Sequence, residues 1–415
     1  MALSPDSSAE YRIEHSSPRY LLPLASVMSL FFLWAIGVHF NDILIPHLKG
    51  TFQLSDFKSS WIQTAFFGGY FVAAIPAARF AERNGYKRGM IAGLLTCAAG
   101  AMMFLPAAMV HAYPLFLLSL FIMACGQSFL EVAANPYVAL LGPPQKSALR
   151  LNLAQAFNAT GAVLTPILGA AFIFGPVERN ASSAHRVSEL RLLAGPYIGL
   201  TMVYLLFAFG ISRVSLPEIQ AAGLAPYRFS SVTRFPQLMR GVVAQFFYVG
   251  AQVGVASFII RLAEYRSPSL QHSMASQYLR YHLLAFLGGR ILGSLLLQRI
   301  SPSKLLAAFA VAAIVASGLV ISAGAMFPVW AAIMLGFCNS IMFPTIFALS
   351  IQGLGDHTKL GSSLLIMAIL GGALLPPVMG LISDRSSIQY AFAVPCASYF
   401  VVLLFAIFSR NSQAA

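Results

Sequence analysis

Charged residues are scarce in this chain of 415 amino acids, where 26 Lys or Arg and 13 Asp or Glu together make up 9% of the sequence. A soluble globular domain carries about 25% charged residues, and it needs that charge to stay in solution. The shortage excludes a soluble globule, and the abundance of apolar residues excludes a disordered or collagen-like chain. The sequence therefore predicts an integral membrane protein.

Cysteine is also rare, and the four cysteines (Cys97, Cys125, Cys338 and Cys396) are far apart, each within an apolar run. No two of them have the spacing of metal ligands, so we expect no metal site and no disulfide framework. The polar stretch from Met1 to Arg19 lacks the apolar centre of a signal peptide. We therefore expect the first apolar segment to stay in the membrane.

Apolar residues are abundant instead, at 58% of the chain, or roughly 240 residues. A membrane-spanning helix needs about 20 of them, so the composition is enough for about twelve spans. The runs are long and do not alternate with a period of two, which indicates helices rather than a barrel. The spans are predicted at 21–45, 59–80, 89–110, 114–140, 150–175, 194–213, 237–262, 275–298, 304–324, 328–352, 360–382 and 389–409.

The net charge of +13 gives the expected orientation. Cytoplasmic loops of membrane proteins collect Lys and Arg, and most of the basic residues fall on the side of the N-terminus. We therefore expect both termini in the cytoplasm of a multi-pass protein of the cell inner membrane, with the lipid bilayer rather than nucleic acid as its partner.

A weak internal repeat predicts that the spans form two bundles. The segment Gly161–Pro166 (GAVLTP) resembles Gly371–Pro376 (GGALLP), 210 residues later. Two similar bundles around a midplane site are typical of transporters. The predicted fold is an all-α membrane protein with twelve transmembrane helices in two six-helix bundles. Its predicted divisions are a cytoplasmic tail (1–20), a first bundle (21–213), a cytoplasmic linker (214–236), a second bundle (237–410) and a C-terminal tail (411–415).

Few charges lie inside the predicted spans, and an ionisable group there indicates function because burying it costs at least a few kcal/mol. Glu131 lies deep in the fourth span, and Asp42 lies near the outer end of the first, three residues after His39. An unpaired carboxylate in a membrane must bind a proton or find a partner. Both acids are candidates for proton coupling, with a hydrogen-bonding acid as the structural alternative for Glu131 and an interfacial acid for Asp42.

Uncharged polar residues recur at helical spacing in both predicted bundles. Amides suit the neighbouring hydroxyls of a sugar, because each offers donors and an acceptor. Hydrogen bonds between helices are the alternative explanation for each of them. The candidate substrate-binding residues, Glu131 included, are His39, Asn41, Asn135, Gln155, Asn158, Gln245, Tyr248, Gln252 and Asn339.

Two arginines are assigned structural or gating roles. Arg290 lies in the eighth predicted span, and Arg83 lies in the basic loop after the second. We expect both to fasten helix ends on the cytoplasmic side and to gate the closed state. A phosphate-binding loop of the Gly-x4-Gly-Lys type is absent, which argues against drive by ATP. The sequence also shows no nucleophile–base arrangement, so we expect no enzyme activity and no cofactor beyond a coupling ion.

Four segments of the chain resemble the fucose–galactose–glucose:proton symporter branch of the major facilitator superfamily. They are Asn41–His47 (NDILIPH), Phe129–Tyr137 (FLEVAANPY), Leu141–Pro144 (LGPP) and Arg150–Asn158 (RLNLAQAFN). The resemblance implies alternating access to a central sugar site. It implies further that Asp42 and Glu131 couple transport to protons and that Gln155 contacts the sugar. His39 stands where relatives of this branch tend to have asparagine.

The leading hypothesis is a monomeric, proton-coupled monosaccharide symporter. A proton-coupled exporter of drugs or other amphipathic compounds is an alternative, since Gly161–Pro166 faintly resembles an antiporter signature. Sodium could replace the proton, because a carboxylate with nearby amides can ligate it. A sugar receptor locked in one state is a further reading, without any specific support in the sequence.

Overall fold

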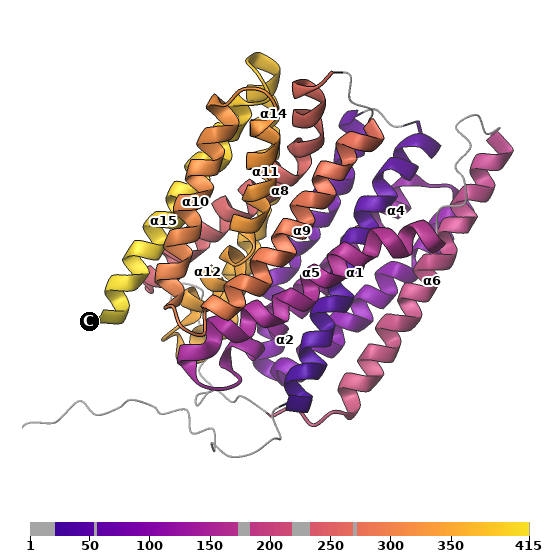
Figure 1. Cartoon of the computed structure of the whole chain (residues 1–415). Coiled ribbons are helices and arrows are strands. Elements are labelled where there is room, and N and C mark those ends of the chain that lie inside the picture. The colour runs from indigo at the N-terminus through magenta and orange to yellow at the C-terminus, as the bar shows by residue number, and fades with distance from the viewer. Residues whose placement is uncertain (1–20, 54–55, 173–182, 218–232, 269–271, 415) are drawn as a thin grey trace, which may run out of the picture.

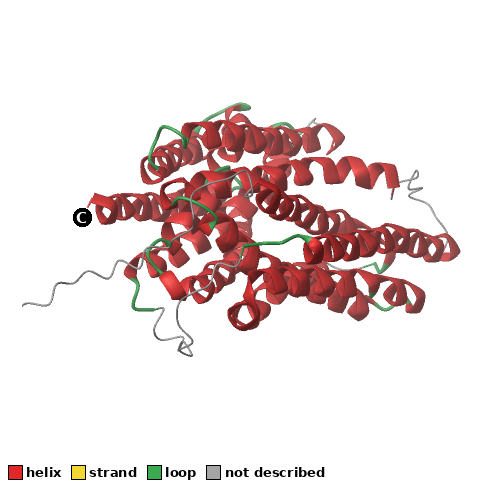
Figure 2. Ribbon diagram, turned by 90° about the horizontal axis from the view of Figure 1, so that it is seen from below, coloured by secondary structure: helices red, strands yellow, loops and turns green. Residues whose placement is uncertain are grey.

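The computed structural model describes residues 21–53, 56–172, 183–217, 233–268 and 272–414. Within its helices some side chains, including those of residues 40–47, are also outside the described part. The predicted N-terminal tail and most of the predicted linker lie outside it as well, so their boundaries stay predictions. The described residues contain helices and connecting turns and no strand (Figure 2).

Among the described residues, the first half of the chain forms six α-helices, which lie in the first six predicted spans. They are α1 (Leu21–Thr51), α2 (Asp56–Met102), α3 (Phe104–Val110), α4 (Tyr113–Leu140), α5 (Ser147–Phe172) and α6 (Ser183–Arg213). The second half fills the other six predicted spans with α8 (Pro236–Arg266), α9 (His272–Leu296), α10 (Pro302–Ser322), α11 (Phe327–Asn339), α12 (Met342–Ile351), α13 (Thr358–Met367), α14 (Gly371–Arg385) and α15 (Ala393–Ala414). Short 3₁₀ turns lie at Pro144–Lys146, Gly355–His357, Ala368–Leu370 and Tyr390–Phe392.

Some predicted spans and observed helices differ in their divisions. Helix α2 has 47 residues, which would measure about 70 Å if straight, or more than twice the hydrocarbon thickness of a bilayer. It contains two crossings, because Gly85 has a non-helical backbone (φ 84°, ψ 164°) that glycine adopts without strain. The predicted span 328–352 is broken into α11 and α12, and 360–382 into α13 and α14.

The outer surface of the helices is apolar, which fits a lipid environment. Leu206 is 66% exposed, Phe209 57% and Phe400 53%, whereas a soluble monomer rarely exposes such extended apolar patches. Nine stretches of the described residues are long and apolar enough to cross a membrane, and one of them, Thr64–Val110, holds the two crossings joined at Gly85. The expected all-helical membrane fold is therefore present.

The two halves lie side by side, with the indigo-to-pink helices on one side and the orange-to-yellow helices on the other (Figure 1). Within the first half α2 packs against α4 and α6, and within the second half α10 packs against α15. Between the halves α5 packs against α9 and α12, and α13 packs against α2 and α4. Lys359, next to the start of α13, places its ammonium 4.8 Å from the ring centre of Tyr86, beside the α2 turn.

The repeat noticed in the sequence corresponds to one packing device used in both halves. A Cβ at Gly161 of α5 would lie 2.7 Å from the Phe32 carbonyl oxygen of α1. A Cβ at Gly371 of α14 would collide with the Phe246 carbonyl oxygen of α8. In each half a glycine thus allows one helix to approach the backbone of the other, as small residues commonly do in membranes.

Arg150 closes the turn between α4 and α5, which contains the segment Leu141–Pro144. Its guanidinium donates to the carbonyl oxygens of Val138 (3.1 Å), Pro143 (2.9 Å) and Gly142 (3.3 Å), and also to that of Ala139. The last carbonyls of a helix have no partner within it and carry its negative dipole. The arginine therefore caps the end of α4 and holds the start of α5 beside it.

The close helix contact at Gly371 predicts a specific loss of stability when this residue is enlarged. Gly371→Ala should lower the free energy of unfolding by roughly 1–3 kcal/mol, because the new methyl group forces α14 away from α8. Gly380→Ala is the matched control on the same helix, since nothing lies within 4 Å of a Cβ at that position. Thermal unfolding in detergent measures both, and equal melting temperatures for the two variants would contradict the close α8–α14 packing.

Candidate functional site

Two buried charges lie on opposite halves of the molecule. Of the Asp, Glu, Lys and Arg side chains that the structure describes, only Glu131 on α4 and Arg290 on α9 are buried, with exposed fractions of 3% and 2%. Burying a charge is expensive unless hydrogen bonds or an opposite charge compensate for it. The partners of these two groups therefore define the candidate site.

Glu131 has an incomplete set of partners. Its Oε2 atom is buried without a hydrogen bond, while the hydroxyl group of Tyr70 on α2 interacts with its carboxyl group. One turn further along α4, the Asn135 side-chain nitrogen donates to the Glu131 carbonyl oxygen at 3.1 Å. The acid can thus take or release a proton at an atom that no other group occupies.

A chain of amides leads from Glu131 towards the second half. The Asn135 side-chain oxygen accepts a hydrogen bond from Nε2 of Gln155 on α5 at 3.3 Å. Both residues are buried, at 0% and 5% exposed. Glu131, Asn135 and Gln155 all belong to the candidate substrate-binding set, and the structure brings them together.

Arg290 joins this chain from the other half. Its Nη1 donates to the Gln155 carbonyl oxygen at 2.7 Å and to Oε1 of the same side chain at 3.3 Å. Its Nε donates to the Ser340 carbonyl oxygen at 2.7 Å, just beyond α11, and its Cζ lies 4.5 Å from the ring centre of Phe286. All of these hydrogen-bond acceptors are neutral oxygens. The Arg290 guanidinium therefore connects the two halves through hydrogen bonds and not through an ion pair in these contacts.

A second group of amides lies within the second half. The Tyr248 hydroxyl on α8 donates to the Asn339 carbonyl oxygen at 2.9 Å. Both side-chain polar atoms of Gln245 and of Asn339 are buried without a hydrogen bond, although the Tyr399 hydroxyl lies near the Asn339 amide. Gln252 is half-buried on the same helix as Tyr248. Unsatisfied amides are uncommon in folded proteins, and each calls for an explanation.

Other predicted site residues are placed elsewhere or are not described. Asn158 donates to the Phe31 carbonyl oxygen at 3.1 Å and so fastens α5 to α1. Arg83 is exposed at the α2 turn, and His39 is half-buried on α1. Asn41 and Asp42 lie on α1, but their side chains are outside the described residues. The roles predicted for these five residues stay predictions.

Sequence reasoning missed Asn152 as a contact between the halves. Its Nδ2 donates to Thr345 Oγ1 on α12 at 3.2 Å, three residues before Gln155 on the same helix. It also missed the pair formed by Tyr70 and Gln127, whose hydrogen bond measures 2.9 Å. The position of Gln127, four residues before Glu131 on one helical face, was the available signal.

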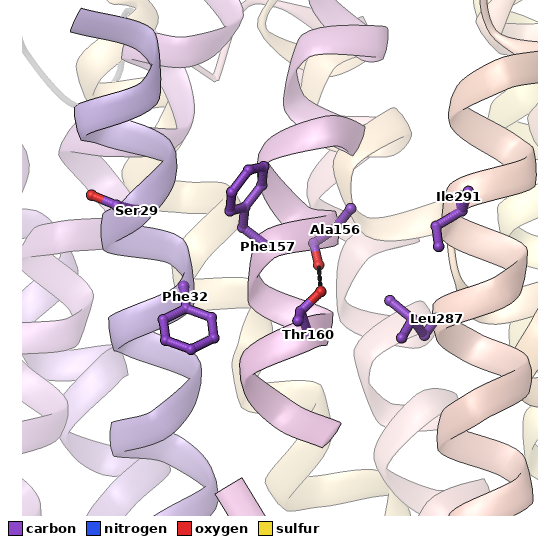
Figure 3. Close-up of a pocket in the computed structure, with 7 residues that line it drawn as sticks. All are labelled: Ser29, Phe32, Ala156, Phe157, Thr160, Leu287 and Ile291. Carbon is purple, nitrogen blue, oxygen red and sulfur yellow. Dashed lines mark hydrogen bonds between the residues drawn. The ribbon is translucent and has the colours of Figure 1, made fainter. Parts of the chain in front are cut away.

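An apolar groove lies at the edge of the interface between the halves (Figure 3). It has a volume of about 490 Å³ and is lined by Ser29, Phe32, Ala156, Phe157, Thr160, Leu287 and Ile291. The Thr160 hydroxyl donates to the Ala156 carbonyl oxygen at 2.9 Å, and the Ser29 hydroxyl donates to the Ser26 carbonyl oxygen at 2.7 Å. Because both hydroxyls are used by their own helices, the groove suits hydrocarbon rather than a sugar.

Comparison with known proteins is consistent with this architecture. The family model described as Major Facilitator Superfamily matches residues 25–369. A protein named glucose/galactose transporter from Brucella abortus biovar 1 (strain 9-941) is 36% identical over 99% of this chain and 100% of its own length. The L-fucose-proton symporter of Escherichia coli (strain K12) is 37% identical over 96% of this chain and 95% of its own.

A solved structure is similar over nearly the whole chain as well. The crystal structure of FucP, described as a Major Facilitator Superfamily transporter in the outward conformation, superimposes with a TM-score of 0.88 at 37% identity. The match covers 94% of this chain and 99% of that one. The arrangement of the helices around the buried network is thus a known architecture.

The contact between Arg290 and Gln155 predicts how the halves respond to a substitution. Arg290→Lys keeps the charge but cannot reach Ser340 and Gln155 together, because lysine lacks the planar fork of donors. A hydrogen bond from a charged group is worth about 1.5–3 kcal/mol. The equilibrium constant for the contact between Arg290 and Gln155 should therefore fall about tenfold or more. Electron-spin distances between labels at Glu82→Cys and Lys304→Cys should gain a longer component.

Arg266→Lys is the matched control for this experiment. Arg266 donates to the Ala325 carbonyl oxygen and to Gln389 Oε1, both within the second half. Its substitution should leave the distance distribution unchanged. An unaltered distribution in Arg290→Lys would show that Arg290 does not hold the halves together.

Proposed function

The chain belongs to the Major Facilitator Superfamily, and we propose that it couples proton entry to the uptake of a fucose-, galactose- or glucose-type monosaccharide by alternating access. Two relatives that match over almost their full length are named for sugar transport, and one of them is named a proton symporter. The shared helix arrangement with FucP supports the same class of function.

The observation that carries the proposal is the position of Glu131 in the buried network. A carboxyl group with a free oxygen lies one turn from Asn135, which donates to the Glu131 backbone carbonyl and leads through Gln155 to the contact between the halves. Protonation removes its charge, and this changes which hydrogen bonds it makes. The proposed proton site is thus next to the amides that hold the interface between the halves, and this proximity supports coupled transport.

Sugar recognition is assigned to the amides and the tyrosine of both halves. Gln155 is the proposed contact from the first half, together with Asn135 and with His39, Asn41 and Asn158 of the predicted set. Gln245 and Asn339 contribute side-chain atoms that have no hydrogen bond in this arrangement. A sugar with hydroxyl groups on most of its carbons satisfies such groups, and Tyr248 and Gln252 complete the proposed set.

The proposed cycle begins with the site open to the outside, where Glu131 and Asp42 take protons. Sugar then binds between the halves, the halves rock, and sugar and proton leave on the other side. Moving one charge through 100 mV is worth about 2.3 kcal/mol, and each pH unit adds about 1.4 kcal/mol. We propose a monomeric, multi-pass protein of the inner membrane with both termini in the cytoplasm.

Uptake into proteoliposomes tests the proposal directly. Purified protein is offered a panel of labelled monosaccharides while a proton gradient or a sodium gradient is imposed. The proton gradient should drive accumulation, and the sodium gradient should not. Accumulation driven by the sodium gradient alone would show that sodium is the coupling ion. Export of an amphipathic dye without sugar uptake would favour the antiporter.

Substitution of the two acids tests the coupling. Glu131→Gln keeps the shape of the side chain but removes the titrating group, so uptake should lose its dependence on pH. Asp42→Asn should abolish uphill accumulation while exchange of sugar between the two sides continues. If the pH profile of Glu131→Gln overlays that of the parent, then Glu131 is a structural acid.

Gln155→Ala tests the sugar contact. Loss of its hydrogen bonds to the ligand should weaken sugar binding by roughly 1–3 kcal/mol. Thr160→Ala, one turn and a half along the same helix, is the control, because that hydroxyl bonds only to its own helix. Sugar affinity is measured by titration calorimetry, and parental affinity in Gln155→Ala would remove this residue from the site.

A further inference from the structure

A second buried polar cluster lies behind Glu131, inside the first half. It consists of Tyr70 from α2, Gln127 from α4 and Tyr204 from α6, which are 3%, 0% and 0% exposed. None of these three residues reaches the second half in any described contact. Burying three polar side chains in an apolar bundle is costly unless their hydrogen bonds are satisfied.

The cluster is continuous with the carboxyl group of Glu131. The Tyr70 hydroxyl donates to Gln127 Oε1 at 2.9 Å, and it also interacts with the Glu131 carboxyl group. At the far end, Gln127 interacts with the Tyr204 hydroxyl. Gly37 of α1 makes room for this end, because a Cβ there would lie 2.9 Å from Gln127 Nε2 and would collide with the Tyr204 hydroxyl.

The donors and acceptors in this arrangement have a consistent direction. Tyr70 uses its only proton on Gln127, so it can meet Glu131 only as an acceptor. Glu131 must then be the donor, and it can donate only when its carboxyl group is protonated. The Gln127 amide nitrogen is left facing the Tyr204 oxygen. Donation by Tyr70 to Gln127 therefore fits the protonated form of the acid.

Deprotonation of Glu131 reverses every one of these bonds. A carboxylate only accepts hydrogen bonds, so the Tyr70 proton turns towards Glu131. Tyr70 then needs a donor, which Gln127 provides by a half turn of its amide group. The amide oxygen now faces Tyr204, whose hydroxyl donates to it. In both states each group faces a complementary donor or acceptor, and the positions of the heavy atoms are nearly unchanged.

We propose that Tyr70 and Gln127 are positioning residues that set the proton affinity of Glu131 by offering it an acceptor when it is protonated and a donor when it is charged. The proposal rests on the proposed function, in which Glu131 carries the coupling proton. Tyr204 completes the relay, and its oxygen and the Gln127 nitrogen lack a hydrogen bond of good geometry in the present arrangement, which leaves the amide free to turn.

Other titratable groups around Glu131 belong to different contacts. Cys97 of α2 lies at the far end of the relay beside Tyr204. Arg290 of α9 approaches from the opposite side, beyond Asn135 and Gln155. Helix α1 carries His39 and Asp42, and α5 carries Arg150, which caps α4. Among the described titratable groups, Tyr70 is the one that interacts with the Glu131 carboxyl group itself.

Tyr70→Phe tests the proposal, because it removes the hydroxyl and keeps the ring that packs 5.4 Å from the ring of Phe66. A hydrogen bond to a charged carboxylate is stronger than one from the neutral acid. Removal of the hydroxyl therefore destabilises the charged form of Glu131 more than the protonated form. The midpoint of the alkaline limb of sugar uptake should therefore move up by about one pH unit. The measurement is proton-driven uptake in proteoliposomes across external pH.

Ser128→Ala is the matched control for the same pair of helices. The Ser128 hydroxyl is buried on α4 and donates to the Tyr70 carbonyl oxygen at 3.1 Å, so its loss weakens the α2–α4 contact without touching the relay. Its pH midpoint should equal that of the parent. Gln127→Met, which is similar in shape, should shift the midpoint in the same direction as Tyr70→Phe.

The double variant separates this inference from the proposed function. In a Glu131→Gln background, Tyr70→Phe should not move the pH profile any further, because the two changes act through one group. A pH profile of Glu131→Gln that overlays that of the parent would overturn the coupling role of Glu131 in the proposed function. The relay alone is overturned if Glu131→Gln loses its pH dependence while Tyr70→Phe keeps the parental midpoint. Equal shifts of the midpoint in Tyr70→Phe and Ser128→Ala would overturn it as well.

Discussion

The burial of the Arg290 guanidinium is the constraint on which the arrangement of the two halves depends. A charge that is 2% exposed within apolar helices must have hydrogen-bond acceptors. Its own half supplies one of them, the Ser340 carbonyl, and the other half supplies two on Gln155. Separating the halves removes two of these acceptors, so water or a ligand must replace them when the site opens.

This constraint connects the interface to the acid. Gln155 accepts from Arg290 and donates to Asn135, and Asn135 donates to the backbone beside Glu131. A change at either end alters the partners available to the glutamine, which is a physical route for coupling between two sites. The remaining contacts, such as Asn152 with Thr345 and Lys359 with Tyr86, hold the same interface without reaching the acid.

Much of the fold could be predicted from the sequence, because long apolar runs report on the membrane directly. The glycine repeat was also readable, and Gly161 and Gly371 make equivalent helix contacts. The division at Gly85 within α2 was predicted, because the charged segment between the spans 59–80 and 89–110 contains it. The break between α11 and α12 was not predicted, since it occurs inside one long apolar run. For the site, charge scarcity singled out Glu131 and Arg290, but only the structure shows that Gln155 lies between them. Tyr70 could not be singled out from the sequence, because a tyrosine in an apolar run is usually a packed core residue.

The two polar clusters on either side of Glu131 have different consequences for the carrier. Towards the second half, Asn135 and Gln155 lead to a contact that must break during transport. Towards the interior of the first half, Tyr70 and Gln127 lie on helices of one bundle, whose packing can persist while the halves rock. Only the first cluster therefore changes with the conformation of the carrier, whereas the second travels with the acid. An acid placed between them has one steady neighbouring cluster and one that depends on the state, so its proton affinity can differ between the two states. Under the proposed function, that difference, rather than burial alone, allows a proton gradient to drive a conformational cycle.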